Sequence, residues 1–296
     1  MIHARRPYSL RLPGEQVLRL GERTLVMGIL NVTPDSFADG GAYLDPDRAL
    51  ETALRFEAEG ADLIDIGGES TRPGADPLSA EDELARVLPV LERLAGRVGI
   101  PVSVDTYKAA VARQVVDRGA AMINDISALR YDPELAGVVA TAGVPIVLMH
   151  NRGRSIEMYR EARYENVASE VVHELTLAIQ RATDAGVSRQ QIVVDPGLGF
   201  AKRAPQTFST LANLQTLNSL DRPILVGPSR KSFLTDALGD IPPDAREWGT
   251  AAAVTAAVLL GAHIVRVHGV REMAQVVRVA DELRASSEPE RREISE

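Results

Sequence analysis

Three polar residues, spaced along the chain, each come directly after a short apolar run: Asp105, Asn124 and Asp195. A single Asp in such a place more often caps the helix that follows it. Two carboxylates and one amide that open into the same cavity instead suit a flat heterocycle with several N–H donors, such as a 2-amino-4-oxo pterin or a guanine edge. If the fold brings the three together, their types predict a binding site for a nitrogen heterocycle.

Positive charge is concentrated in two segments near the C-terminal end of the sequence. Residues 227–232 read GPSRKS, which is not a P-loop because Arg230 stands where glycine must precede Lys-Ser. Arg266 and His268 alternate along a later apolar run, so they share one face if that run is a strand. The plainer interpretation is a solvated Arg-Lys pair and one structural histidine. Together the segments favour a clamp for phosphate oxygens, with Lys231 as a compact charge for a ring oxygen or a carboxylate.

A glycine-rich loop offers further donors to an anion. Residues 67–74 read GGESTRPG, in which Thr71 supplies a hydroxyl, Arg72 a guanidinium and the glycines freely folding backbone. Such a set can surround phosphate oxygens. An ordinary Gly-Pro loop with a solvated arginine would have the same composition.

A second loop has the composition of a lid. Residues 31–41 read NVTPDSFADGG, in which Asn31 offers an amide oxygen, Asp35 a carboxylate and Phe37 an apolar surface. Proline and paired glycines favour a loop that can open and close. Alone this stretch could be a turn without chemistry, but the presence of two such loops favours a ligand site.

Eight short apolar runs, each followed by a helical stretch, must position these groups. The runs cover residues 25–30, 63–66, 102–104, 121–123, 144–149, 192–194, 224–226 and 263–267. Helical periodicity is plain in residues 46–59, 80–94, 108–118, 164–185, 206–217 and 249–260. Alternating strands and helices form a parallel sheet, and eight such units close into a barrel whose polar strand ends share one mouth. We therefore predict the α/β class and a single (β/α)8 TIM barrel.

The remaining segments set the domain boundaries. Residues 1–24 alternate short apolar stretches with turn residues, which predicts a small hairpin that closes the bottom of the barrel. The barrel itself is expected over residues 25–285. Residues 286–296 are charged and nearly free of apolar side chains, which predicts a frayed tail.

Composition excludes several classes of function. The net charge of −8 gives no global attraction for nucleic acid or an anionic membrane, so an anionic substrate must be held by local arginine and lysine. With no cysteine, thiolate catalysis and Cys-based zinc sites are excluded, and a reducing cytoplasm is favoured. No run approaches the roughly 18 apolar residues of a membrane span, and no signal peptide is expected. The histidines lack the spacing of a zinc hydrolase.

Seven motifs, in order along the chain, resemble those of the dihydropteroate synthase family. They are NVTPDSF (31–37), DIGGESTRPG (65–74), VD (104–105), INDI (123–126), DPGLGF (195–200), SRKS (229–232) and RVH (266–268). The first two together are highly specific, whereas the short pieces would be weak alone. The resemblance covers residues 25–280 or so. It departs from the family's usual pattern at residues 151–153 (NRG), at Gly269 and at Ala201, and none of these residues has an assigned role.

The resemblance implies a cytoplasmic transferase of folate biosynthesis, a homodimer and sulfonamide target without nucleic acid or membrane partners. It would join 6-hydroxymethyl-7,8-dihydropterin pyrophosphate to 4-aminobenzoate with Mg²⁺ as cofactor. The implied pterin ligands are Asp105, Asn124, Asp195 and Lys231, with Arg266 beside the ring. The implied diphosphate site comprises Thr71, Arg72, Arg266 and His268, and Asn31 would bind Mg²⁺. The implied aminobenzoate pocket comprises Phe37, Pro73, Lys231 and Ser232.

A mechanism follows as a hypothesis. Loss of diphosphate from the pterin CH₂ leaves a cation, which Asp35 would stabilise while Arg72, Arg266 and His268 stabilise the leaving group. Closure of the two loops would exclude water. The aromatic amine is neutral at pH 7 and can attack without a strong base, so no general base is assigned. Lys231 would bind both substrates.

Three rival functions share the barrel. A corrinoid-dependent methyltransferase that uses methyltetrahydrofolate would have the same pterin-binding residues, but it has no diphosphate to bind. A degenerate homologue that only binds a pterin or a partner is disfavoured by the intact polar residues. A Schiff-base aldolase usually has its lysine on the sixth strand, where this chain has Asp195.

Overall fold

A computed structural model describes residues 5–33, 45–71, 74–154 and 157–287 of the chain. Eight parallel strands form one sheet in the order β8-β7-β6-β5-β4-β3-β10-β9. A parallel bridge between Val194 and Ile224 joins the two outer strands, so the sheet closes. The strands are β3 (Leu25–Asn31), β4 (Leu63–Gly67), β5 (Val102–Asp105), β6 (Met122–Asp125), β7 (Ile146–Met149), β8 (Ile192–Asp195), β9 (Leu225–Val226) and β10 (Ile264–Val267). The predicted (β/α)8 barrel is confirmed.

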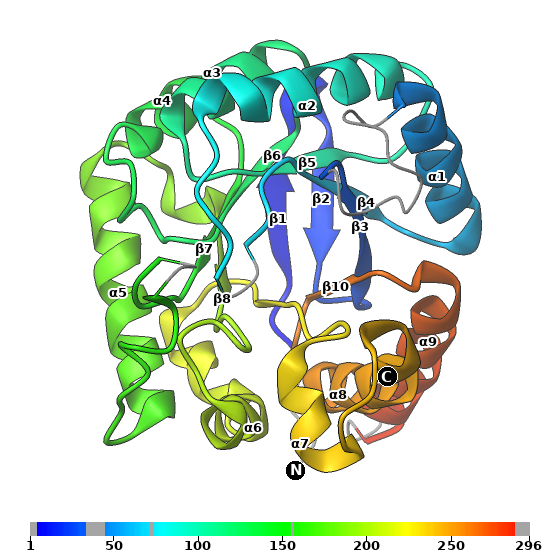
Figure 1. Ribbon diagram of the computed structural model, residues 1–296, viewed down its shortest axis with the longest axis vertical. Coiled ribbons are helices and arrows are strands. Elements are labelled where there is room, and N and C mark those ends of the chain that lie inside the picture. The colour runs from blue at the N-terminus through cyan, green and yellow to red at the C-terminus, as the bar shows by residue number, and fades with distance from the viewer. Residues whose placement is uncertain (1–4, 34–44, 72–73, 155–156, 288–296) are drawn as a thin grey trace, which may run out of the picture.

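The α-helices surround this sheet, as Figure 1 shows. They are α1 (Pro46–Glu59), α2 (Ala80–Leu94), α3 (Ala109–Asp117), α4 (Leu135–Ala142), α5 (Val167–Asp184), α6 (Ala204–Ala212), α7 (Thr235–Leu238), α8 (Glu247–Leu259) and α9 (Val270–Ser287). Short 3-10 turns are η1 (Pro13–Glu15), η4 (Arg189–Gln191), η5 (Leu214–Leu220), η6 (Ser232–Leu234) and η7 (Pro243–Arg246). Side-chain oxygens of Asp45, Ser79 and Asn166 cap the starts of α1, α2 and α5.

The core has two parts. Between the sheet and the helices lies a large cluster of Val, Ile, Leu and Ala side chains. Inside the barrel, a smaller cluster contains one or two residues from each of several strands, among them Met27, Leu63 and Met122. Leu10 and Leu20 belong to the same inner cluster, and they come from the antiparallel hairpin of β1 (Tyr8–Arg11) and β2 (Val17–Leu20).

The hairpin therefore covers the end of the barrel from which the strands start, where residues 1–24 are predicted to lie. His263, which precedes β10, packs edge-to-face on Tyr8 at this same end. At the other terminus, α9 continues to Ser287, two residues into the predicted tail. The rest of that tail lies outside the described residues.

Candidate functional site

Alternate residues of each strand face the inside of the barrel. Along these inward-facing positions, the apolar residues of the inner cluster come first, and polar residues follow toward the C-terminal ends of the strands. Strand register pairs Gly67 with Asp105 and Asp105 with Asn124, so these positions lie at one level. Asp195 pairs with Met149 at the end of β8. Because all eight strands are parallel, their polar C-terminal residues meet at one mouth.

A buried ion-pair network forms one side of this mouth. Arg266 donates from Nε to Asp65 Oδ2 at 2.6 Å and from Nη2 to Asp105 Oδ2 at 3.0 Å. Asn124 donates from Nδ2 to the same Asp65 oxygen at 2.9 Å. Asp105, Asn124 and Arg266, which the sequence predicts as ligand-binding residues, are thus held together through Asp65.

Asp195 and Lys231 form the other side. Asp195 Oδ1 accepts a hydrogen bond from the Gly197 N–H at 2.7 Å. Lys231 Nζ donates to the Leu198 carbonyl at 2.6 Å and lies 4.5 Å from the centre of the Phe200 ring. A Cβ placed on Gly227 would lie 3.9 Å from Lys231 Nζ and 3.8 Å from Arg266 Cβ, so these two cations flank the same glycine. Both sides therefore lie at the same mouth of the barrel.

The remaining predicted residues lie around the rim. His268 Nδ1 is 2.9 Å from Ser229 Oγ, which also accepts from the His268 backbone N–H at 3.1 Å. A Cβ placed on Gly67 would lie 3.4 Å from Asn31 Oδ1 and 4.0 Å from Asp105 Oδ2, which places Asn31 beside the acidic group. Thr71 is half-buried in the loop after β4, and Ser232 is exposed at the start of η6.

Four predicted residues lie outside the described residues: Asp35, Phe37, Arg72 and Pro73. Their predicted roles remain predictions.

Burial shapes the charges of this site. It raises the pKa of Asp105 to about 8, although the Arg266 guanidinium acts against that shift. It raises the pKa of Asp195 too, with Lys231 as the main opposing charge. Burial lowers the pKa of Lys231 to about 8, against the attraction of Asp195. Asp105 and Lys231 thus both have a pKa of about 8 at one barrel mouth, and such perturbed pKa values are typical of ligand-binding and catalytic sites.

Asp65 is the functional residue that sequence reasoning missed. Its side chain is fully buried, and its Oδ1 accepts no hydrogen bond from the described residues. The signal was present, because a carboxylate in the middle of an apolar run stands at an inward-facing position and opens the DIGGESTRPG motif. A charge at such a position needs partners, and Arg266 and Asn124 supply them.

A second overlooked group holds the loop after β4. Lys108 forms ion pairs with Glu69 of that loop and with the buried Glu83 of α2. The Tyr107 hydroxyl donates to Glu69 at 2.9 Å. These contacts fix the segment that leads to Thr71.

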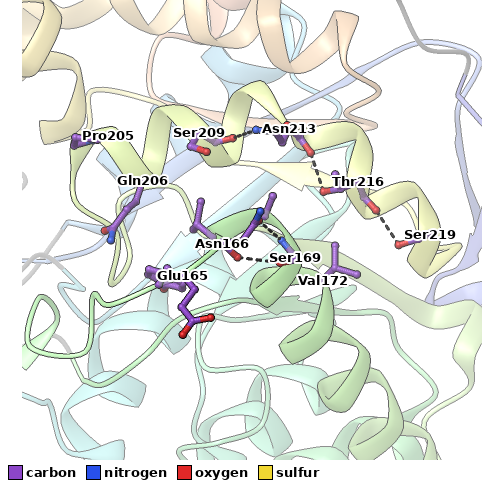
Figure 2. Close-up of a pocket in the computed structure, with 13 residues that line it drawn as sticks. Glu165, Asn166, Ser169, Val172, Pro205, Gln206, Ser209, Asn213, Thr216 and Ser219 are labelled. Atoms are coloured by element: carbon purple, nitrogen blue, oxygen red, sulfur yellow. Dashed lines mark hydrogen bonds between the residues drawn. The ribbon is translucent and has the colours of Figure 1, made fainter.

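A separate groove of about 670 Å³ runs between α5 and α6, outside the barrel (Figure 2). Several of its polar side chains already have partners in the protein. Asn166 Oδ1 accepts from the Ser169 N–H at 3.1 Å, and Asn213 Nδ2 donates to the Ser209 carbonyl at 2.8 Å. We therefore locate the candidate site at the barrel mouth and not in this groove.

Fold and site together define a (β/α)8-barrel enzyme whose mouth carries carboxylates, an amide and two cationic side chains. A sequence profile described as pterin binding enzyme matches residues 27–268. The dihydropteroate synthase of Bacillus subtilis (strain 168) is 45% identical over 260 residues, which are 88% of each chain.

Solved structures agree with this relationship. The Xanthomonas albilineans dihydropteroate synthase with 4-aminobenzoic acid has a TM-score of 0.87 and 41% identity, covering 95% of this chain and 99% of its own. The Yersinia pestis dihydropteroate synthase in a sulfonamide drug complex has a TM-score of 0.87 and 41% identity, covering 94% and 99%. The chain belongs to the pterin-binding enzyme family, among the dihydropteroate synthases, which are transferases.

Proposed function

We propose that this chain joins 6-hydroxymethyl-7,8-dihydropterin pyrophosphate to 4-aminobenzoate, forming 7,8-dihydropteroate and pyrophosphate in folate biosynthesis. The observation that carries this proposal is that Asp105 and Asp195 open on one mouth together with Arg266 and Lys231. Carboxylates and an amide suit the N–H donors of the ring, and the cations suit its diphosphate. The related structure that holds 4-aminobenzoic acid supports the choice of second substrate.

The reaction needs little from an acid or a base. The bond between the pterin CH₂ and the diphosphate oxygen breaks, and the amine nitrogen of 4-aminobenzoate forms a new bond to that carbon and then loses one proton. Arg266 and His268, with Arg72, would stabilise the negative charge that develops on the diphosphate. Asp35 would stabilise the cationic pterin carbon.

Asn31 fits a role in binding Mg²⁺. Among the described residues no group of three or more His, Asp and Glu side chains is arranged to hold a metal ion. Mg²⁺ in phosphoryl sites is commonly held by one or two protein oxygens together with substrate phosphates, and Asn31 Oδ1 offers one such oxygen at the mouth. When bound, the ion would neutralise charge on the leaving diphosphate.

The aminobenzoate would lie nearer the rim than the pterin. Ser232 is exposed beside Lys231, at the start of η6. With Phe37 and Pro73 these residues would form the second pocket. A sulfonamide, which has the shape of the aminobenzoate, would occupy the same place, and the Yersinia pestis relative forms a complex with a sulfonamide drug.

We also propose a homodimer in the cytoplasm. Trp248 of α8 is 87% exposed, and Val279 and Leu283 of α9 are exposed as well, an apolar set that a second copy of the chain would cover. None of the described helices is both long and apolar enough to cross a membrane. Light scattering of the purified protein should give twice the chain mass of 31.9 kDa, and Trp248→Glu should reduce it to one chain.

One assay tests the proposed reaction. Purified protein is incubated with dihydropterin pyrophosphate, radiolabelled 4-aminobenzoate and Mg²⁺, and both dihydropteroate and pyrophosphate are measured. We expect equal amounts of the two products, and Asp195→Asn should abolish most of the turnover. Absence of both products, or a requirement for cobalamin and a methyl donor, would contradict the proposal.

A further inference from the structure

A buried lysine lies behind the site, in the loop between β8 and α6. Lys202 follows the DPGLGF motif and is only 1% exposed. Its Nζ donates to the carbonyls of Gly197 and Phe200, each at 3.1 Å, and lies 2.8 Å from His150 Nδ1. Burial lowers the pKa of Lys202 well below its usual value, and the three acceptors match the three N–H donors of the charged form. All the donors of this lysine are therefore used by the protein, and none is exposed to solvent.

The third acceptor is held in one tautomer by an acidic neighbour. His150 Nε2 lies 3.1 Å from Glu174 Oε2, so the proton of the neutral ring belongs on Nε2 and its Nδ1 is free to accept from Lys202. Burial lowers the pKa of His150 to about 3, which keeps the ring neutral in the physiological range. Glu174 in turn pairs with Arg152. Arg152, which belongs to the NRG segment at residues 151–153 that departs from the family's usual pattern, is therefore the last residue of this series of contacts.

The loop that Lys202 holds has very little freedom. Gly197 has a φ of 66°, and a Cβ there would lie 1.9 Å from the His150 carbonyl oxygen, so the loop rests directly on the end of β7. The same loop supplies the Gly197 N–H that binds Asp195 and the Leu198 carbonyl that binds Lys231 Nζ at 2.6 Å.

We propose that Lys202 is a positioning residue for the pterin site: it fixes residues 197–200, and through them the orientation of Asp195 and Lys231. This inference rests on the proposed function, because it assigns the held residues to pterin binding. A fully buried cation is a costly way to stabilise a loop, since apolar packing of the same volume is often at least as stabilising. Its three donors, however, fix three acceptors in one geometry, which suits a device that sets position.

The experiment compares ligand affinity, measured by calorimetry with 6-hydroxymethylpterin pyrophosphate, in single and double variants. Lys202→Met keeps the volume and removes the donors, and we expect it to weaken binding about tenfold or more. In a Lys231→Met background the same change should cost at least about threefold less than in the natural chain, because one of the two side chains that it positions is already absent. Arg203→Met, which alters the adjacent exposed residue, is the matched control and should leave affinity unchanged.

A second pair of variants keeps the test decisive if Lys202→Met does not fold. His150→Asn and His150→Leu introduce side chains with the same branching and the same number of heavy atoms, but only asparagine can present an oxygen near the former Nδ1 position. We expect His150→Asn to bind the ligand at least fivefold more tightly than His150→Leu. In the natural chain, ¹⁵N NMR should show the Nε2–H tautomer of His150.

The outcomes separate the two proposals. If the natural chain does not bind the pterin, the proposed function fails and this inference fails with it. If the natural chain binds, the inference alone is overturned by either of two results: equal affinity of the two His150 variants, or the same loss from Lys202→Met with and without Lys231. The second result would show that Lys202 serves the fold as a whole.

Discussion

At the scale of single residues, the site depends on charged and polar side chains that neutralise and hydrogen-bond one another. Arg266 reaches two carboxylates, and one of these, Asp65, also receives the amide of Asn124. With its Nδ2 used in this way, Asn124 keeps its carbonyl oxygen for a ligand N–H. Asp65 therefore determines how two ligand-binding side chains are presented.

We predict that Asp65→Asn lowers kcat/KM at least about tenfold, because the amide keeps an oxygen for both donors but loses the negative charge that pairs with the Arg266 guanidinium. Steady-state kinetics measure the effect. Ser103→Ala is the matched control, since Ser103 is the register partner of Asp65, is equally buried and makes no side-chain hydrogen bond to the described residues. Equal losses of kcat/KM in Asp65→Asn and Ser103→Ala would contradict this prediction, because they would show that any substitution at this level of the barrel lowers activity.

A pH dependence follows from Lys231. Its pKa is lowered to about 8, so its positive charge is present below that pH and is lost as the pH rises through it. Asp105 gains its negative charge over the same range, so the natural chain alone does not isolate the effect. The ratio of pterin affinity between the natural chain and Lys231→Met should therefore be largest below pH 8 and fall above it. A ratio that stays constant from pH 6 to 10 would contradict this assignment.

At the scale of elements, the strands were the most predictable part of the fold. All eight apolar runs are strands, because a strand buried on both faces must be continuously apolar. Three helices were not named, and one of them, α7, has only four residues, too few to show a helical period. Helix α4 reads LAGVVATA, which is too uniformly apolar to show a period of 3.6, and α9 follows directly on the RVH motif.

Helix ends were predicted less well than helices. The stretch 206–217 was predicted as one helix, but it divides at Asn213 into α6 and the 3-10 turn η5, where the backbone leaves helical geometry. The stretch 164–185 begins later than predicted, because Asn166 caps α5. The site was predictable where a polar residue ended a strand, and Asp65 was missed because it lies inside one. Which side chains bond one another depends on strand register, which a single sequence does not fix.

The hairpin of β1 and β2 gives a prediction at this scale. Leu20 is 1% exposed and closes the inner cluster from below, far along the barrel from the site. We predict that Leu20→Ala lowers the free energy of unfolding by about 2–5 kcal/mol, measured by urea denaturation, while kcat at a temperature well below the transition changes less than about twofold. Val17→Ala, at a 52% exposed position of the same hairpin, is the control and should have little effect. A fall of kcat well beyond twofold in Leu20→Ala would contradict this prediction, because it would show that the two ends of the barrel are coupled.

At the scale of the whole molecule, charge is distributed unevenly. The chain carries a net charge of −8, yet Lys231, Arg266 and His268 gather at the mouth. An anionic substrate therefore meets attraction only over a short range, at the site itself.

We predict that affinity for the pyrophosphate ester weakens several-fold between about 0.05 and 0.5 M salt, because salt screens the attraction between the diphosphate and these half-buried cations. The alcohol without its diphosphate should show less than a twofold change over the same range, since its contacts with Asp105, Asn124 and Asp195 are buried. Calorimetry on the two ligands makes the comparison. Equal salt dependence would place the diphosphate away from the cationic side chains.

Few backbone contacts close the barrel between its first and last strands in the sheet order, β8 and β9. Strand β9 has only two residues, and the parallel bridge between Val194 and Ile224 joins it to β8. Asp195 stands on one side of this seam and the loop that carries Lys231 on the other. A ligand bound by both Asp195 and Lys231 would hold β8 and β9 together where the barrel has its fewest strand contacts. Ligand binding should therefore slow amide hydrogen exchange along these two strands.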